Sequence, residues 1–151
     1  MYTCTKKYID IPFAHRQHNH KGHCRLIHGH NWSFEFVFVA KKLDECGFVM
    51  DFGSLKWIKE WLELTFDHKL VLNKDDPALS YLENSLIRQA CLLPGPFAEI
   101  TKVPNCGAEG LAQYVFEQIN KELTNLSKRV TIQSLTVYED SKNSATYSIN
   151  V

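Results

Sequence analysis

The sequence has no excess of either charge, because 17 basic and 17 acidic residues give a formal net charge of zero. A basic surface that would indicate a nucleic-acid partner is therefore not expected. No apolar stretch is long enough to cross a bilayer, and the first residues lack the apolar core of a signal peptide. We expect a cytoplasmic protein that binds neither membrane nor nucleic acid.

Paired cysteines are also missing. The chain has five cysteines, an odd number, and none of them forms a Cys-x-x-Cys pair. This usage fits a reducing compartment better than a disulfide framework. A length of 151 residues predicts a single domain, residues 1–151, that is large enough to bury a substantial core.

Histidine, in contrast, is concentrated in one place. Six of the seven histidines lie in a sixteen-residue stretch together with one cysteine: His15, His18, His20, His23, Cys24, His28 and His30. Imidazole nitrogen and thiolate sulfur are ligands that zinc prefers. The stretch is therefore a candidate metal site.

The spacing of the histidines indicates which of them share a site. His28 and His30 flank a glycine and lead into a run, 31–40, in which aromatic residues alternate with others. Such alternation predicts a strand, and residues two apart on a strand point to the same side. His15 ends the preceding apolar run, so a hairpin of the two strands would place it beside His28 and His30.

Two other interpretations stay open at this stage. The histidines can belong to a solvated loop, or His20, His23, Cys24 and His28 can form a closed structural zinc site. The second is weakened by the missing Cys-x-x-Cys pair. Three histidines with a vacant fourth position favour a catalytic metal.

Hydrophobic periodicity predicts an α+β fold. We expect strands at 2–14, 31–42, 129–139 and 144–151, helices at 54–66, from 77 onward and at 108–126, and a short edge strand within 97–103. The four main strands form two hairpin-like pairs, which predicts a four-stranded antiparallel sheet with helices packed on one face. Its unprotected edges favour homo-oligomerisation.

Further polar residues are candidates for chemistry, although each has an ordinary alternative. Cys24 can act as a base or nucleophile near a metal, or it can be a fourth ligand or a buried thiol. Asp67-His68 is a carboxylate–imidazole pair at a helix end, where caps are common. Glu139 ends an apolar strand, and a glutamate there usually faces solvent.

The assembled pattern resembles the 6-pyruvoyltetrahydropterin synthase / 6-carboxytetrahydropterin synthase family. The matching motifs, in order, are His15, Cys24-Arg-Leu-Ile-His28-Gly-His30-Asn, Gly47-Phe-Val-Met-Asp-Phe52, Phe66-Asp67-His68-Lys-Leu, Ala108-Glu109-Gly-Leu-Ala112 and Val137-Tyr-Glu139. The three-residue gap between Cys24 and His28 resembles the bacterial carboxytetrahydropterin branch, which serves queuosine synthesis. The resemblance implies a tunnelling fold in which trimers close a barrel and two trimers stack into a homohexamer.

The resemblance also implies roles for individual residues. His15, His28 and His30 would hold zinc, and Cys24 would accept a proton. His68 would relay protons together with Asp67. Glu139 would anchor the pterin ring and take part in the relay, and Glu109 would be a second-tier substrate-binding residue.

The implied reaction is that of a zinc-dependent lyase. It would convert 7,8-dihydroneopterin triphosphate into 6-carboxy-5,6,7,8-tetrahydropterin, releasing acetaldehyde and triphosphate. Lys21 and Arg25 are candidates to hold the triphosphate. One departure is visible, because the segment 104–109 lacks the threonine that the family commonly has there. A 6-pyruvoyltetrahydropterin product, an aldolase activity on dihydroneopterin and a zinc-stabilised binding module without turnover stay open as alternatives.

Overall fold

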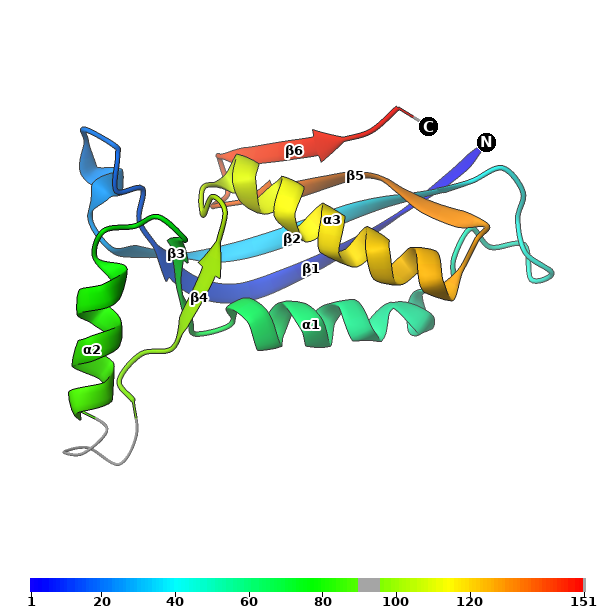
Figure 1. Cartoon of the computed structure of the whole chain (residues 1–151). Helices are drawn as coiled ribbons and strands as arrows, with labels where there is room; N and C mark the ends of the chain where they lie inside the picture. Colours follow the sequence, from blue (N-terminus) through cyan, green and yellow to red (C-terminus); the bar gives the residue numbers. More distant parts are fainter. Residues whose placement is uncertain (90–95, 151) are drawn as a thin grey trace.

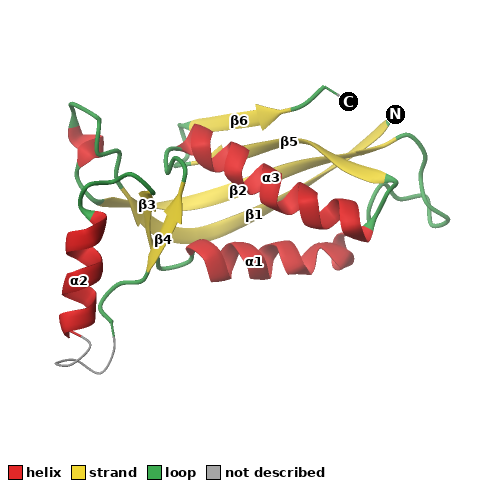
Figure 2. Cartoon of the chain, in the orientation of Figure 1, coloured by secondary structure: helices red, strands yellow, loops and turns green. Residues whose placement is uncertain are grey.

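The computed structural model describes residues 1–89 and 96–150, and within them the chain forms one mixed sheet and three α-helices (Figures 1 and 2). The strands are β1 (Tyr2–His15), β2 (His28–Ala40), β3 (Leu70–Asn73), β4 (Ile100–Val103), β5 (Val130–Tyr138) and β6 (Ser144–Ser148). The helices are α1 (Lys56–Phe66), α2 (Leu79–Gln89) and α3 (Ala108–Leu126), with 3-10 turns η1 (His23–Arg25) and η2 (Phe52–Leu55).

The expectation of a purely antiparallel four-stranded sheet is wrong. The sheet has six strands in the order β4-β3-β1-β2-β5-β6. The four expected strands are present and pair antiparallel. The two added strands pair parallel, β3 with β1 and β4 with β3. The α+β class is confirmed, but the sheet is mixed.

The missed strand, β3, is too short for periodicity to reveal it. Its four residues are all buried, so they show no alternation between a polar and an apolar face. A short, continuous apolar run of this kind does not distinguish a strand from a buried helical segment. The edge strand expected within 97–103 is confirmed as β4, although it begins only at Ile100.

Helices α1 and α3 cover one face of the sheet (Figure 1). Their buried stripes pack on the aromatic face of β2, where Trp32, Phe34, Phe36 and Phe38 are all buried. The predicted alternation along β2 is therefore confirmed on this face. Helix α2 stands at the end of the sheet near β3 and β4 (Figure 1), where Leu79 and Leu82 pack with Leu70 and Leu72 in a second, smaller cluster. The predicted end of this helix, before Pro94, lies outside the described residues.

A β-bulge decides which way β1 presents its last residues. The register of β1 against β2 shifts between Tyr8 and Ile11, and Asp10 has a positive φ of 60°. The extra residue brings Tyr8 and His15, seven positions apart, to the same face of the sheet, although strict alternation would place them on opposite faces. The Asp10 carboxylate accepts a hydrogen bond from Asn31 Nδ2 at 2.8 Å, which holds the bulge against β2.

Besides the outer edge of the short strand β4, two longer stretches of sheet edge have no partner strand within the described chain. β1 pairs with β3 only at Ala14 and His15, so the outer edge of residues 2–9 is open. β6 is the last strand on the opposite side. Among the described residues, no helix is both long and apolar enough to span a membrane.

Candidate metal centre

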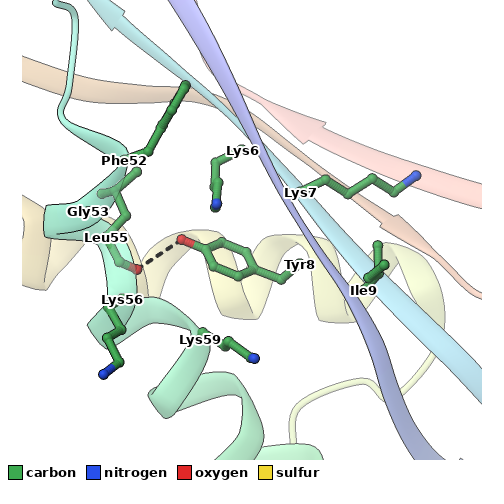
Figure 3. A pocket seen from close by; sticks show the side chains of 9 residues that line it. All are labelled: Lys6, Lys7, Tyr8, Ile9, Phe52, Gly53, Leu55, Lys56 and Lys59. Atoms are coloured by element: carbon green, nitrogen blue, oxygen red, sulfur yellow. Dashed lines mark hydrogen bonds between the residues drawn. The ribbon is translucent and has the colours of Figure 1, made fainter.

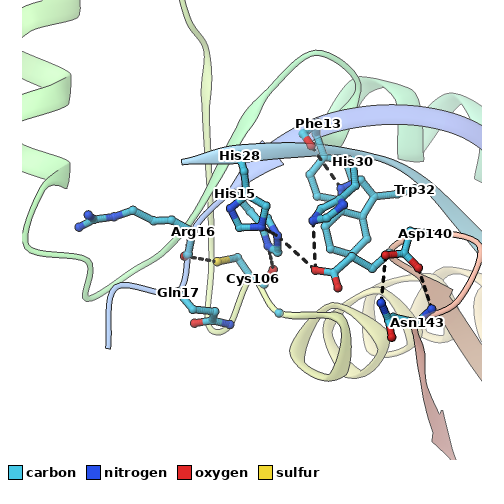
Figure 4. A network of polar contacts seen from close by, with 12 residues as sticks. Phe13, His15, Arg16, Gln17, His28, His30, Trp32, Cys106, Asp140 and Asn143 are labelled. Carbon is cyan, nitrogen blue, oxygen red and sulfur yellow. Dashed lines mark hydrogen bonds and ion pairs between the residues drawn. The ribbon is translucent and has the colours of Figure 1, made fainter. Parts of the chain in front are cut away.

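Three histidines converge at one end of the sheet (Figure 4). A glutamate lies beside them. His15 ends β1, and it lies opposite His28 in the antiparallel register of β1 and β2. His30 follows two residues along β2, and Glu139 comes directly after β5. One ligand atom from each of the four lies within 4.8 Å of the others. The structure thus brings together the three histidines that the spacing predicted.

Backbone carbonyls orient two of the imidazoles. His15 Nδ1 donates to the Cys106 carbonyl at 2.8 Å, and His28 Nδ1 donates to the Leu26 carbonyl at 2.7 Å. A carbonyl only accepts hydrogen bonds, so both neutral rings carry their proton on Nδ1 and turn the Nε2 lone pair to the centre. The two Nε2 atoms are 3.1 Å apart.

Burial keeps His15 neutral. Its side chain is almost fully enclosed, and its residue is only 2% exposed. Burial lowers the pKa of His15 to about 4; the Cys106 carbonyl opposes this effect, and the neighbouring His28 and His30 add to it. The neutral imidazole is the form that binds a metal ion.

The turn between β5 and β6 holds the carboxylate of the cluster. Glu139 Oε1 lies 3.3 Å from His15 Nε2 and 3.4 Å from His30 Nε2. The next residue, Asp140, accepts the backbone N–H groups of Lys142 and Asn143, which lower the pKa of its carboxyl group. Glu139 N–H donates to the Asn143 carbonyl at 3.0 Å. The cross-bonded turn therefore fixes the strand end from which Glu139 projects.

The three histidines fit a zinc ion, and the Glu139 carboxylate lies beside them. Lone pairs that face each other repel, and His30 Nε2 is buried without a hydrogen-bond partner, so a cation between these nitrogen atoms would relieve the repulsion. Donor atoms at the usual bond lengths from a tetrahedral zinc lie about 3.3 Å apart. The His15 and His28 Nε2 atoms, 3.1 Å apart, are close to that spacing, and Glu139 Oε1 lies 3.3 Å from His15 Nε2 and 3.4 Å from His30 Nε2, beside the place of the ion. Trp32, edge-on to His15 and His30, forms the apolar floor.

The comparisons with known proteins agree with this geometry. Residues 3–150 match the family model described as 6-pyruvoyl tetrahydropterin synthase. The chain belongs to that family. The 6-carboxy-5,6,7,8-tetrahydropterin synthase of Rickettsia conorii is 30% identical over 92% of this chain and 94% of its own length.

A further relative matches over a shorter stretch, and solved structures of low sequence identity match in fold. The enzyme of the same name from Rickettsia typhi is 42% identical over half of this chain and 55% of its own length, so the chain matches only about half of that relative. An uncharacterized protein from Wolinella succinogenes shares the fold with a TM-score of 0.84 at 19% identity, over 99% of this chain and 98% of its own. The 6-pyruvoyl tetrahydropterin synthase of Plasmodium vivax matches over 100% of both chains with a TM-score of 0.68 at 18% identity.

Cys24 lies beside the cluster in sequence but is not one of its four residues. It is exposed in the 3-10 turn η1, and its carbonyl accepts the Gln17 N–H at 2.7 Å. This bond folds the loop back against the end of β1. Arg25, expected to hold triphosphate, donates to the loop carbonyls of Lys21 and Gly22.

Asp67 and His68 form the expected pair, pointing into solvent. His68 Nδ1 donates to Asp67 Oδ1 at 2.7 Å, which leaves Nε2 free to exchange a proton. The His68 side chain is 83% exposed, and its backbone has a φ of 57°. A non-glycine residue in the left-handed region is strained, and such strain is common at functional sites. The His68 N–H donates to the Pro12 carbonyl of β1 at 2.8 Å, which holds this conformation.

A network of amides occupies the place where the family threonine is missing. A Cβ atom on Gly107 would lie 2.6 Å from Gln17 Nε2, so the glutamine side chain fills that space. Glu109 follows in the first turn of α3, and its Oε2 would be 3.5 Å from the same Cβ. Sequence patterns do not point to Gln17 or Cys106, because neither belongs to a recognisable ligand or capping pattern.

Two hollows elsewhere on the chain are lined by other residues. One of about 440 Å³ between β1 and α1 is lined by Lys6, Lys7, Tyr8, Ile9, Phe52, Gly53, Leu55, Lys56 and Lys59 (Figure 3). Its Lys56 and Lys59 lie near glutamates one helical turn further along α1. Another, of about 330 Å³, is apolar and has His68 at its border.

Proposed function

We propose that the protein is a zinc-dependent lyase that converts 7,8-dihydroneopterin triphosphate and water into 6-carboxy-5,6,7,8-tetrahydropterin, releasing acetaldehyde and triphosphate. The observation that carries this proposal is the convergence of the Nε2 atoms of His15, His28 and His30, which would hold the ion, with the Glu139 carboxylate beside them. The names of the Rickettsia relatives support the carboxy product. We propose that this product serves queuosine synthesis and that the protein acts in the cytoplasm.

Each proposed role has a physical basis in this chain. A bound zinc ion supplies Lewis-acid polarisation of substrate oxygen atoms. The Glu139 carboxylate accepts hydrogen bonds from the N–H groups of the pterin edge, and Glu109 supports the pocket from the first turn of α3. Cys24 takes the side-chain proton, and His68, oriented by Asp67, passes protons from its free Nε2.

We further propose that the active site is completed by another copy of the chain. Cys24 and His68 are both exposed, and neither belongs to the histidine–glutamate cluster. The open edges of β1 and β6 are able to pair with other copies, and such pairing closes a barrel of the tunnelling type. A homohexamer of two stacked trimers would complete the active site with residues of another copy and would also pair the open strand edges. If light scattering showed that the active protein is a monomer at working concentration, the proposed homohexamer would be contradicted.

Product analysis is the direct test of the reaction. Purified protein with one equivalent of zinc is incubated with dihydroneopterin triphosphate, and the products are identified by mass spectrometry. We expect 6-carboxytetrahydropterin and acetaldehyde in equal amounts. A 6-pyruvoyl product, which the name of the matching family favours, would show that elimination occurs without carbon–carbon cleavage. No turnover, with loss of the fold on chelation, would indicate a zinc-stabilised binding module.

Two variants separate binding from chemistry. Cys24→Ala leaves the cluster intact, so we expect it to keep zinc and bind substrate while turnover falls. Glu139→Ala leaves buried pterin donors unmatched, which should weaken substrate binding by about 1–3 kcal/mol. Turnover at the wild-type rate by Cys24→Ala would end its assignment as the base. Unchanged substrate binding by Glu139→Ala would end its assignment as the pterin anchor.

A further inference from the structure

Cys106 connects the candidate metal centre to a chain of side-chain amides that begins at the buried Asn73. It lies in the irregular segment between β4 and α3, and its carbonyl accepts a hydrogen bond from His15 Nδ1. Since no strand ladder holds this segment, side chains and single backbone groups fix it. The Cys106 N–H donates to Asn73 Oδ1 at 2.7 Å, and the thiol donates to the Arg16 carbonyl at 3.0 Å.

Asn73 is the first member of the amide chain. It ends β3 and is only 7% exposed. Its Nδ2 donates to Gln17 Oε1 at 3.1 Å, and Gln17 Nε2 donates to Asn105 Oδ1 at 2.8 Å. Asn105 Oδ1 also accepts the Gly107 N–H at 2.9 Å.

Two backbone donors fix the direction of every bond in this chain. The Cys106 N–H requires an oxygen from Asn73, and the Gly107 N–H requires an oxygen from Asn105. The amides between them then fit in one orientation only. The Cys106 N–H belongs to the peptide that joins Asn105 to Cys106. The Gly107 N–H belongs to the peptide that joins Cys106 to Gly107, and the carbonyl of that peptide accepts the hydrogen bond from His15. Asn73 therefore holds the first peptide directly and the second through Gln17 and Asn105.

We propose that Asn73 is a positioning residue of the metal centre, acting on His15 through the Cys106 peptide. Without its carboxamide, the Cys106 N–H and Gln17 lose their bonds to Asn73, the two peptides on either side of Cys106 are held less firmly, and the bond that sets the tautomer and ring plane of His15 weakens. Partners of this kind behind a metal-bound histidine contribute roughly 10–100-fold to metal affinity. The role rests on the proposed function of His15 as a zinc ligand.

A double-mutant cycle tests whether Asn73 acts through His15. Zinc dissociation constants are measured by chelator competition for the wild type, Asn73→Ala, His15→Ala and the double variant. We expect Asn73→Ala to weaken binding roughly tenfold, at the lower end of that range because it acts one step further out. In the His15→Ala background the same change should have no further effect.

Matched variants keep the test independent of folding. Asn120→Ala removes another asparagine, one that lies on α3 outside the network, and should leave zinc affinity unchanged. Gln17→Ala removes only the support of the second peptide, so it should weaken zinc binding a few-fold. If Asn73→Ala does not fold, this variant tests the positioning role in its place. The visible spectrum of the cobalt-substituted protein provides a readout that does not depend on catalytic activity. It should change in Asn73→Ala and match the wild type in Asn120→Ala.

The outcomes distinguish this inference from the proposed function. Wild-type zinc affinity in both Asn73→Ala and Gln17→Ala would overturn the positioning role while leaving the metal site in place. An equal loss in the wild-type and His15→Ala backgrounds would show that Asn73 acts only on the fold. If the wild type binds zinc no more tightly than His15→Ala, the proposed metal site fails, and the role of Asn73 falls with it.

Discussion

Acidification of the metal-free protein tests the burial of His15. The pKa of His15 is lowered from 6.5 to about 4 in the folded state. Between these values the unfolded chain binds a proton that the folded chain does not, so stability falls as the pH falls through this window. A difference of about 2.5 pKa units corresponds to about 3 kcal/mol, which is fully present above the unfolded pKa and lost by about pH 4.

The assay is urea unfolding of chelator-treated protein at several pH values between about 7 and about 4. The comparison is between the wild type and His15→Gln, since glutamine fills similar space but does not titrate. We expect the stability difference between the two to shrink by about 3 kcal/mol on acidification. His23→Gln, at an exposed histidine of η1, should follow the wild type.

Parallel stability curves for the wild type and His15→Gln would refute the reasoning. They would mean that the His15 imidazole takes up its proton equally well in both states, as an accessible side chain does. With saturating zinc the acid dependence of the wild type should become steeper, because protons then compete with the metal for the same imidazole nitrogen.

Three other changes test separate parts of the structure. His28→Ala removes a cluster ligand and should sharply lower the zinc content measured by mass spectrometry, so a full equivalent of zinc would contradict the assignment. Asp76→Asn leaves Arg16 without its fully buried carboxylate partner and should cost about 3 kcal/mol in urea unfolding; a loss below about 1 kcal/mol, typical of a surface pair, would contradict it. Deletion of Asp10 removes the bulge and should turn His15 to the opposite sheet face, lowering zinc affinity to that of His15→Ala; wild-type affinity would show that β1 recovers its register.

Local patterns determined most of the fold. The alternation along β2 and the stripe of α3 depend on residues two to four positions apart, and each element places those residues on one face whatever surrounds it. The predicted helix at 108–126 therefore coincides with α3. The pairing of His28 with His30 was predictable for the same reason, because both lie on one strand.

The tertiary structure alone decided the rest. The face on which His15 lies depends on the bulge at Asp10, and no periodicity reveals one extra residue in a strand. The short strand β3 exists because its backbone pairs with β1 and β4, which are distant in sequence. Asn73, Gln17 and Cys106 came together only through these long-range pairings. Hydrogen bonds between distant backbone and side-chain groups leave no periodic signal in the sequence, so the support of the metal centre becomes visible only when the chain is folded.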